Sequence, residues 1–326
     1  MINNIDISHV GLIITGLALL TWGSDRFVHG ASALARNFGV TPLLIGLTIV
    51  AFATSAPEIL VSIIAASQEE PGLAFGNAIG SNIVNIGLIL GVTAMIRPIS
   101  LESATLQRKI QILLVVSLMA ILLFLDNYIS RLDGAIMLIS LTIVMIWFVK
   151  LGIQSATNNP TKTNYEAEIP KNVTMKMTLI WLLVGLVALL IGADWLVDGA
   201  IGIARTLNVS EIVIGITIVA FGTSLPELAI SLVSVIKGEY GLAIGNIVGS
   251  NMFNLLAVIG IAAAIHPTTI ASNVLSFHIF VMIAFTFALF MMTYNYNGQA
   301  LLSKMKGVAL LTAYITYSAH VIAQNI

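Results

Sequence analysis

The sequence contains no cysteine and few charged residues. Only 9% of its 326 residues are Asp, Glu, Lys or Arg, while 58% are hydrophobic and the mean hydropathy is +1.01. Soluble domains carry about 25% charged residues, so this composition excludes a water-covered surface. The missing cysteines exclude disulfides, thiolate metal sites and cysteine nucleophiles. A net charge of −1 provides no basic patch for binding nucleic acid. Because the composition is too hydrophobic for a surface covered by water, the chain is expected to lie in a lipid bilayer.

Apolar runs long enough to cross a bilayer occur throughout the chain. A helix crossing the hydrocarbon core, about 30 Å thick, needs roughly 20 mostly apolar residues. We predict ten spans, at about 8–34, 42–66, 72–96, 108–125, 132–151, 177–204, 211–236, 241–265, 273–293 and 306–323. The longest polar stretch follows the fifth span. The sequence therefore predicts an all-α membrane protein with ten transmembrane helices: a first five-helix repeat at 1–151, a linker at 152–176 and a second five-helix repeat at 177–326.

The two halves share an internal repeat. Residues 23–98 align with 192–267 at a constant offset of 169 without a gap, and 34 of the 76 positions are identical. Apolar matches arise by chance in membrane proteins, but matching polar and helix-breaking residues at one register do not. The matching pairs of this kind are Asp25/Asp194, Arg36/Arg205, Thr54/Thr223, Pro57/Pro226, Glu58/Glu227, Asn77/Asn246, Ser81/Ser250 and Asn85/Asn254. We infer that one unit has been duplicated.

Each unit has an odd number of spans, so the second unit is expected to enter the membrane from the opposite side. With the N-terminus outside, the cytoplasmic loops and the cytoplasmic linker carry Arg36, Arg97, Arg108, Lys109, Lys150, Lys162, Lys171, Lys176, Lys237, Lys304 and Lys306. The other face holds Arg131 and Arg205, and Arg26 falls within or near the first span. This bias matches the positive-inside rule for the cell membrane. Inverted repeats with a midplane site are typical of secondary transporters.

Two glutamates lie deep within predicted spans at duplicated positions. Glu58 and Glu227 each lie about 16 residues from the start of a span. A single buried Glu is also explained by protonation and a bond to a neighbouring helix. Two carboxylates brought together by a pseudo-two-fold axis repel, so either one is protonated or a cation lies between them. The matched positions favour a shared divalent cation.

Further oxygen donors surround these glutamates in the sequence. Proline removes an N–H and clashes with the carbonyl four residues earlier. Pro57 is therefore expected to free backbone carbonyls around Ala51 to Ala53, and Pro226 those around Ala220 to Gly222. Neighbouring side chains add hydroxyl and amide oxygens: Thr54, Ser55, Ser81 and Asn85 in the first unit, and Thr223, Ser224, Ser250 and Asn254 in the second. Calcium takes about six to eight oxygen ligands, and such a set disfavours zinc or copper.

Packing is the alternative for several of these polar residues. Small and polar residues commonly join membrane helices, so ligation and packing remain equally open for Ser81, Asn85 and their counterparts. We expect packing roles for Gly76, Gly80, Gly245 and Gly249. Structural roles are also expected for Asn77, Asn246, Asp25 and Asp194, with an ion pathway as the alternative for the two aspartates. The five histidines show no metal-binding spacing.

The segments ATSAPE and GTSLPE, together with GNAIGSN and GNIVGSN, resemble the sodium/calcium exchanger family of cation/calcium antiporters, in particular its compact prokaryotic members. The match covers both alpha-repeats, about 23–98 and 192–267. Proton-coupled calcium exchangers usually carry a G-N-A-x-E-type segment at this place, so sodium coupling is favoured. Two departures are Ala53 in place of the usual Gly, and Asn254 where some members have Asp. Neutral Asn85 and Asn254 also make potassium dependence less expected.

The resemblance implies calcium binding by Glu58 and Glu227, with Thr54 and Thr223 contributing. It implies sodium contacts from Ser55, Ser224, Ser81, Ser250, Asn85, Asn254 and the carbonyls of Ala51 and Ala220. It further implies a sliding gate of helices one and six over an eight-helix core. The linker is too short for the calcium-sensor domains of animal relatives.

The expected function is electrogenic exchange of calcium for sodium by alternating access. No enzymatic activity, cofactor or obligatory protein partner is expected; the ions are cargo. Calcium/proton or potassium-dependent exchange is the alternative within transporters, and a cation channel is the alternative outside them. Channels more often build an axial pore from several subunits. An intramembrane hydrolase is disfavoured because neither GTSLPE nor its counterpart has a partnered histidine, and no H-E-x-x-H occurs.

Overall fold

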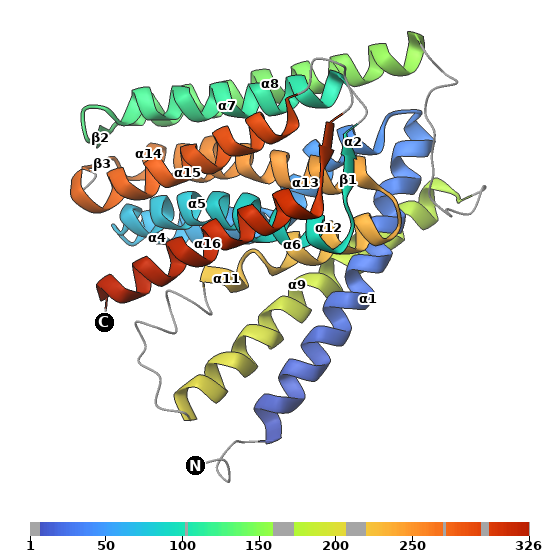
Figure 1. The fold of residues 1–326 in the computed structure, drawn as a ribbon, viewed down its shortest axis with the longest axis horizontal. Coiled ribbons are helices and arrows are strands. Elements are labelled where there is room, and N and C mark those ends of the chain that lie inside the picture. Colours follow the sequence, from blue (N-terminus) through green and yellow to red (C-terminus); the bar gives the residue numbers. More distant parts are fainter. Residues whose placement is uncertain are drawn as a thin grey trace.

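The computed structural model describes residues 7–101, 104–158, 173–206, 220–269, 272–294 and 300–325, which are mostly helical (Figure 1). The elements of the first half are α1 (Ile7–Phe38), α2 (Pro42–Ile45), η2 (Gly46–Val50), α3 (Ala51–Thr54), α4 (Ala56–Ser67), α5 (Pro71–Val84), η3 (Asn85–Leu90), α6 (Gly91–Ile96), β1 (Ile99–Leu101), α7 (Ala104–Phe124), β2 (Tyr128–Ile129) and α8 (Arg131–Asn158). The elements named η are π-helical turns.

The second half follows a similar order. Its elements are α9 (Met175–Thr206), α11 (Ala220–Gly222), α12 (Leu225–Ile236), α13 (Tyr240–Phe253), η5 (Asn254–Val258), α14 (Ile259–Ile265), β3 (Thr268–Thr269), α15 (Ser272–Thr293), β4 (Ala300–Leu302) and α16 (Lys304–Asn325). Most of the predicted linker lies outside the described residues. Helix α8 continues to Asn158, seven residues past the predicted end of the first repeat, and α9 begins at Met175.

Five described helices are long and apolar enough to cross a membrane, or six if one bent pair counts as a single span. They are Ile7–Phe38, Pro71–Ile96, Arg131–Gln154, Met175–Thr206 and Tyr240–Ile265, with Pro42–Thr54 and Ala56–Ser67 forming the pair bent by 43°. Leu225–Ile236 and Phe277–Thr293 are shorter apolar helices, and 211–219 lies outside the described residues. The predicted spans 108–125 and 306–323 correspond to α7 and α16, which are not among the helices that pass on length and hydropathy. These helices establish a membrane-type helical protein, and ten spans remain a prediction.

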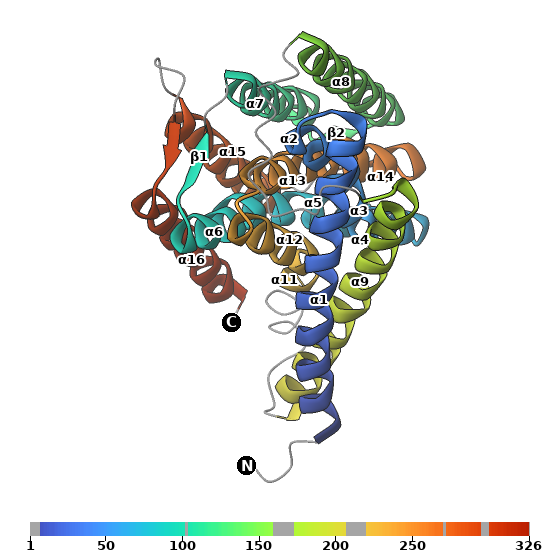
Figure 2. The same ribbon diagram turned by 90° about the vertical axis from the view of Figure 1, so that its right-hand side faces the viewer.

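Helices α1 and α9 form a long pair that runs obliquely to the remaining helices (Figures 1 and 2). Glycines bring the two backbones together, with Gly16 facing Gly192 and Gly23 facing Gly185. A Cβ atom on Gly23 would lie 2.7 Å from the backbone nitrogen of Leu189, so no larger residue fits without a shift. Rising residue numbers on α1 meet falling numbers on α9, which makes the pair antiparallel. Small residues commonly permit such close packing in membrane helices.

Contacts between the halves come in matched sets. Gly91 of α6 packs against Gly307 of α16, while the duplicated residue Gly260 of α14 packs against Gly134 of α8. Strand β1 pairs with β4, and β3, which lies at the position duplicated from β1, pairs with β2. The two small sheets lie at different ends of the bundle (Figure 1). In each of these contacts, a helix or strand of one half packs or pairs with one of the other half.

The buried centre lies around α13, every residue of which from Leu242 to Phe253 is buried. Helix α13 packs against the segment α2, η2 and α3. Gly245 meets the carbonyl oxygen of Leu43, and Gly249 meets Ala51, so these two glycines confirm the predicted packing role. Cβ atoms on Gly76 and Gly80 would meet no described atom within 4 Å. The segment that corresponds to the partners of Gly245 and Gly249, 211–219, lies outside the described residues, so packing by Gly76 and Gly80 stays a prediction.

Candidate cation site

Glu58 and Glu227 occupy the same place in the two halves, in the first turn of α4 and of α12. Each helix begins after a residue that leaves helical geometry, Ser55 with φ −82° and ψ 4° and Ser224 with φ −92° and ψ 5°. A proline follows in the first turn, where its missing N–H costs no helical hydrogen bond. The break therefore places each glutamate next to a helix N-terminus, which favours negative charge.

Both carboxylates are buried and close enough to repel each other. Glu58 and Glu227 are each 1% exposed, and the charge of each acts on the other. The hydroxyls of Thr54, Ser55 and Ser250 lie beside the Glu227 carboxylate. Neither oxygen of Glu227 accepts a well-formed hydrogen bond from the described residues. Two like charges in one buried place require protonation or a cation between them.

Thr54 joins the two halves of the site directly. Its hydroxyl lies 3.1 Å from Asn246 Oδ1 and 3.3 Å from Ser250 Oγ. Asn246 also donates to the carbonyl oxygen of Glu227 at 3.4 Å, which confirms the structural role predicted for this residue. The counterpart Asn77 has an amide nitrogen with no partner among the described residues. The structure therefore brings together Thr54, Ser250 and Glu227 as the sequence predicts.

Buried oxygen atoms without hydrogen-bond partners concentrate at the predicted site residues. Native proteins pair the large majority of their buried polar groups. Within the described part of the chain, the unpaired buried oxygens at predicted site residues are Ser55 Oγ, Glu58 Oε2, Asn85 Oδ1, Ser224 Oγ, both carboxylate oxygens of Glu227 and Asn254 Oδ1; Ser32 Oγ, Asn82 Oδ1 and Ser234 Oγ lie elsewhere in the two repeats. Such a set of neutral and charged oxygens is the chemistry that binds hard cations such as calcium and sodium.

The backbone at both predicted asparagine ligands is π-helical. Asn85 begins η3 and Asn254 begins η5, and both residues are buried. Single π-helical turns within α-helices often occur at functional sites. The i, i+4 spacing of Ser81 and Asn85 identified the helical face, but no sequence pattern revealed the π turn.

The amides Asn82 and Asn251 were not among the predicted site residues. Asn85 Nδ2 donates to Asn251 Oδ1 at 2.9 Å, which leaves Asn85 Oδ1 unpaired. Asn82 Nδ2 lies 3.3 Å from the carbonyl oxygen of Asn251. Both residues belong to the repeated GSN segment, and that repetition was the one available signal for them.

The backbone carbonyls predicted to be free differ between the halves. Ala51 O accepts the N–H of Ser55 at 3.0 Å, so this one of the carbonyls expected to be freed around Ala51 to Ala53 has a backbone partner. In the second half Ser224 N–H donates to Phe221 O at 3.1 Å, not to Ala220 O. Thr223 is partly exposed and takes part in an interaction of its own.

The described residues give little support to a metal site built from several His, Asp or Glu side chains, or to a serine hydrolase. They contain no group of three or more His, Asp or Glu side chains that could hold a metal. The hydroxyls of Ser55 and Ser224 have no hydrogen-bond partner there, so neither forms a described pair with a histidine base. The histidines contact other groups, as His278 does with the Tyr317 hydroxyl at 2.7 Å.

Comparison with known proteins gives a consistent result. The family described as sodium/calcium exchanger protein matches residues 8–150 and 177–323. The chain is 40% identical over 258 residues to the inner membrane protein YrbG of Escherichia coli (strain K12), covering 78% of this chain and 79% of that protein. It is 30% identical over 343 residues to the sodium/calcium exchanger MaX1 of Methanosarcina acetivorans, covering 94% and 96%.

The fold is also similar to a solved one. A structure of the sodium-calcium exchanger NCX_Mj superposes with a TM-score of 0.83 at 36% sequence identity, covering 96% of this chain and 98% of that one. The likeness extends over nearly the whole of both chains.

Proposed function

The chain belongs to the sodium/calcium exchanger family, and from this premise we propose that it exchanges calcium for sodium across the cell membrane by alternating access. The observation that carries the proposal is the pair of buried carboxylates at duplicated positions, Glu58 and Glu227, surrounded by unpaired buried oxygens. A dication between them removes the repulsion that otherwise opposes their burial.

We assign calcium to the two glutamates with Thr54 and Thr223. Sodium binds, in this proposal, to neutral oxygens of the same site: Ser55, Ser81, Asn85 and the carbonyl of Ala51 in the first half, with Ser224, Ser250, Asn254 and the carbonyl of Ala220 in the second. The shared hydroxyls near Glu227 support competition between the two ions, because one set of oxygens cannot enclose both at once. The printed name of MaX1, a sodium/calcium exchanger, agrees with this cargo.

The proposed architecture is ten transmembrane helices in two inverted five-helix repeats, at 1–151 and 177–326. Its support is the matched set of contacts between the halves: the antiparallel α1–α9 pair, the two glycine contacts of α6 and α14, and the exchanged strand pairings. The two backbones of α1 and α9 are in contact, so we propose that they move as one gate over the other helices. This relation between halves is that of many secondary transporters.

Charged residues support an orientation with the N-terminus outside and the linker in the cytoplasm. Two loops assigned to the cytoplasm do lie together, because Arg97 Nη1 donates to the carbonyl oxygen of Ile236 at 3.0 Å. The chain has no native cysteine, so single cysteines report the orientation without background. A cysteine at Lys150 should react from the cytoplasmic side and one at Gln68 from outside; reaction of both from one side would contradict the orientation.

Charge determines the expected electrical behaviour. With both glutamates ionised, one calcium ion neutralises the site, and three sodium ions leave it with one positive charge. Two sodium ions would also neutralise the site and make exchange electroneutral. Because the ligand set offers more than two sodium-sized groups of oxygens and the resemblance to the family favours three, we propose electrogenic exchange of three sodium ions for each calcium. Moving one charge across 100 mV is worth about 2.3 kcal/mol, so an inside-negative membrane favours calcium extrusion.

The experiment is calcium flux in proteoliposomes under imposed sodium, proton or potassium gradients. A sodium gradient at fixed pH should drive calcium, and the reversal point should move with a valinomycin-clamped potential. Flux driven by protons alone would replace the proposal with calcium/proton exchange, and a requirement for potassium would replace it with potassium-dependent exchange. A reversal point that ignores potential would exclude three sodium ions per calcium.

A further inference from the structure

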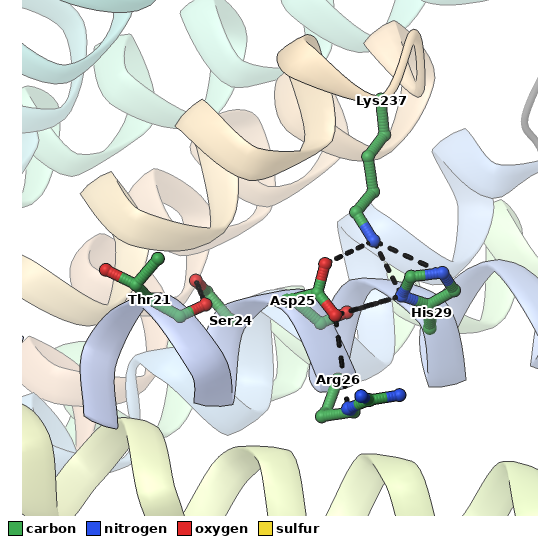
Figure 3. A network of polar contacts seen from close by, with 6 residues as sticks. All are labelled: Thr21, Ser24, Asp25, Arg26, His29 and Lys237. Carbon is green, nitrogen blue, oxygen red and sulfur yellow. Dashed lines mark hydrogen bonds and ion pairs between the residues drawn. The ribbon is translucent and has the colours of Figure 1, made fainter. Parts of the chain in front are cut away.

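An ion pair outside the cation site joins the α1–α9 pair to the rest of the molecule. Lys237, the C-terminal cap of α12, extends to the middle of α1, where its Nζ lies 2.6 Å from Asp25 Oδ1 and 2.6 Å from His29 Nδ1 (Figure 3). Arg26 lies on the other side of α1, with its Nε 4.0 Å from the Asp25 carboxylate. The Lys237 side chain is 23% exposed and that of Asp25 39%.

The position of Lys237 strengthens this contact. A cation at the last residue of a helix interacts favourably with the helix dipole, so Lys237 is stabilised by α12 as well as by Asp25. An ammonium group has donors only, and its acceptor here is the carboxylate of Asp25. His29 Nδ1 lies 2.6 Å from the same ammonium group and 2.8 Å from the backbone carbonyl oxygen of Asp25. The edge of the His29 ring in turn contacts Trp181 of α9, with ring centroids 5.9 Å apart. One lysine of the core therefore reaches a cluster formed by both gate helices.

The duplicated positions lack the partner for such a bond. Asp194 of α9 corresponds to Asp25, but Gln68, the C-terminal cap of α4, corresponds to Lys237. His29 corresponds to Asp198, a second acidic residue. Asp194 is exposed and forms no ion pair with a described residue. The aspartate is duplicated, and its lysine is not.

We propose that Asp25 and Lys237 are positioning residues that hold the gate helices in one of the two transport states. The inference rests on the proposed alternating access of inverted repeats. If the halves exchange conformations, contacts on one side are replaced by their duplicated counterparts on the other. The counterpart here is Asp194 with Gln68, which forms no ion pair. The bond is therefore available in the described state and absent from the alternate one, so it shifts the equilibrium towards the described state.

Removing the bond should change the apparent calcium affinity in opposite directions on the two faces. The apparent affinity decreases when the fraction of molecules in the binding-competent state decreases. For a partly exposed pair we expect shifts on the order of 2- to 10-fold. Lys237→Gln and Asp25→Asn should weaken apparent binding on the face opened by the described state and strengthen it on the other. A merely structural role would change both faces alike or lower the amount of folded protein.

The second half provides matched controls. Asp194→Asn makes the same chemical change at the duplicated position and should leave the ratio of the two affinities unchanged. Gln68→Lys supplies the missing partner for Asp194 and should shift the ratio in the same direction as Lys237→Gln, because it stabilises the alternate state. Adding Asp194→Asn to Gln68→Lys should abolish that shift.

Two measurements test the proposal separately from the exchange activity. The first is calcium-dependent flux from each face of oriented proteoliposomes. The second is the distance distribution between spin labels on cysteines at Leu17 of α1 and Ile236 of α12, which are 51% and 60% exposed. We expect Lys237→Gln to decrease the population with the distance of the described state. An unchanged distribution and unchanged affinity ratio in Lys237→Gln would overturn the positioning role. If the native protein shows no exchange at all, the proposed function fails, and the label distances still decide whether the ion pair holds α1.

Discussion

Helices α5 and α13 carry the same motif in different surroundings. Both contain Gly-Asn, a Gly-Ser-Asn segment and an asparagine that begins a π-helical turn. Helix α13 is buried from Leu242 to Phe253, whereas Gly72 and Gly76 of α5 are exposed. Gly245 and Gly249 touch the backbone or side chains of the segment α2, η2 and α3. In the described part of the chain, α13 is therefore covered by the segment before Thr54, whereas most of the corresponding segment before Thr223, 211–219, lies outside the described residues.

The asparagines at the π-helical turns differ in the same way. Asn85 is held by Asn251, while both polar side-chain atoms of Asn254 lack partners among the described residues. An inverted repeat held at one moment of a transport cycle is expected to differ between its halves. Sequence symmetry therefore identifies the candidate ligands, but it does not predict which hydrogen bonds each of them makes.

The largest expected effect tests whether the glutamates are equivalent despite this asymmetry. Glu58→Gln and Glu227→Gln should each reduce calcium exchange to background, because each removes half of the negative charge while keeping volume and hydrogen bonding. Calcium flux in proteoliposomes measures this, with Glu69→Gln, outside the site, as the charge control. Near-normal transport by either variant would remove that glutamate from the site and make the halves unequal in chemistry.

A second prediction contrasts the duplicated glycines. Gly245→Ala places a Cβ atom 2.6 Å from Leu43 O, and such overpacking typically costs about 1–3 kcal/mol. Gly76→Ala should cost less than Gly245→Ala if the face of α5 is as open as the described residues leave it, since its Cβ meets no described atom within 4 Å. Thermal unfolding in detergent measures both. If the α5 face is covered in the alternate state, Gly76→Ala should still slow exchange; equal destabilisation by both variants would show that the two faces are equally packed.

A third prediction contrasts Asn251 with Asn82. Asn251→Ala leaves Asn85 Nδ2 buried without its acceptor, which costs about 1–3 kcal/mol and should weaken apparent sodium affinity by roughly 10-fold. Asn82→Ala removes only a 3.3 Å contact to a backbone carbonyl and a 3.6 Å contact to Met282 Sδ, so its effect should be smaller. Sodium dependence of calcium flux at fixed protein amount measures the difference. A larger effect of Asn82→Ala would contradict the assignment of Asn251 as the residue that holds Asn85.

The smallest expected effect concerns the neighbouring threonine. Thr54→Ser keeps the hydroxyl that lies between Asn246 and Ser250, so it should change apparent calcium affinity by less than about threefold, whereas Thr54→Val removes both contacts. The same pair of substitutions at Thr223, which is partly exposed, should differ less from each other. Calcium titration of flux in the four variants provides the measurement. Equal effects of Thr54→Ser and Thr54→Val would mean that the hydroxyl does not matter.

The sequence by itself determined the membrane environment, the duplicated unit and the residue types of the candidate site. Hydropathy and charge depend only on composition, and Glu58 and Glu227 are recognised because a constant offset aligns residues without reference to their contacts. The helix breaks at Ser55 and Ser224 were also predictable, because proline acts on the backbone immediately before it. The hydrogen bond from the Ser55 N–H to Ala51 O was not predicted, because proline removes only its own N–H.

Only the tertiary structure decided how these residues meet. The contact of Asn85 with Asn251, the bond between Lys237 and Asp25, and the packing of Gly245 against Leu43 join segments more than 100 residues apart. Burial and hydrogen bonding of a side chain depend on which distant backbone packs against it, and two copies of one motif have the same local preferences. Sequence repetition therefore predicts two equal halves, and packing alone makes them different.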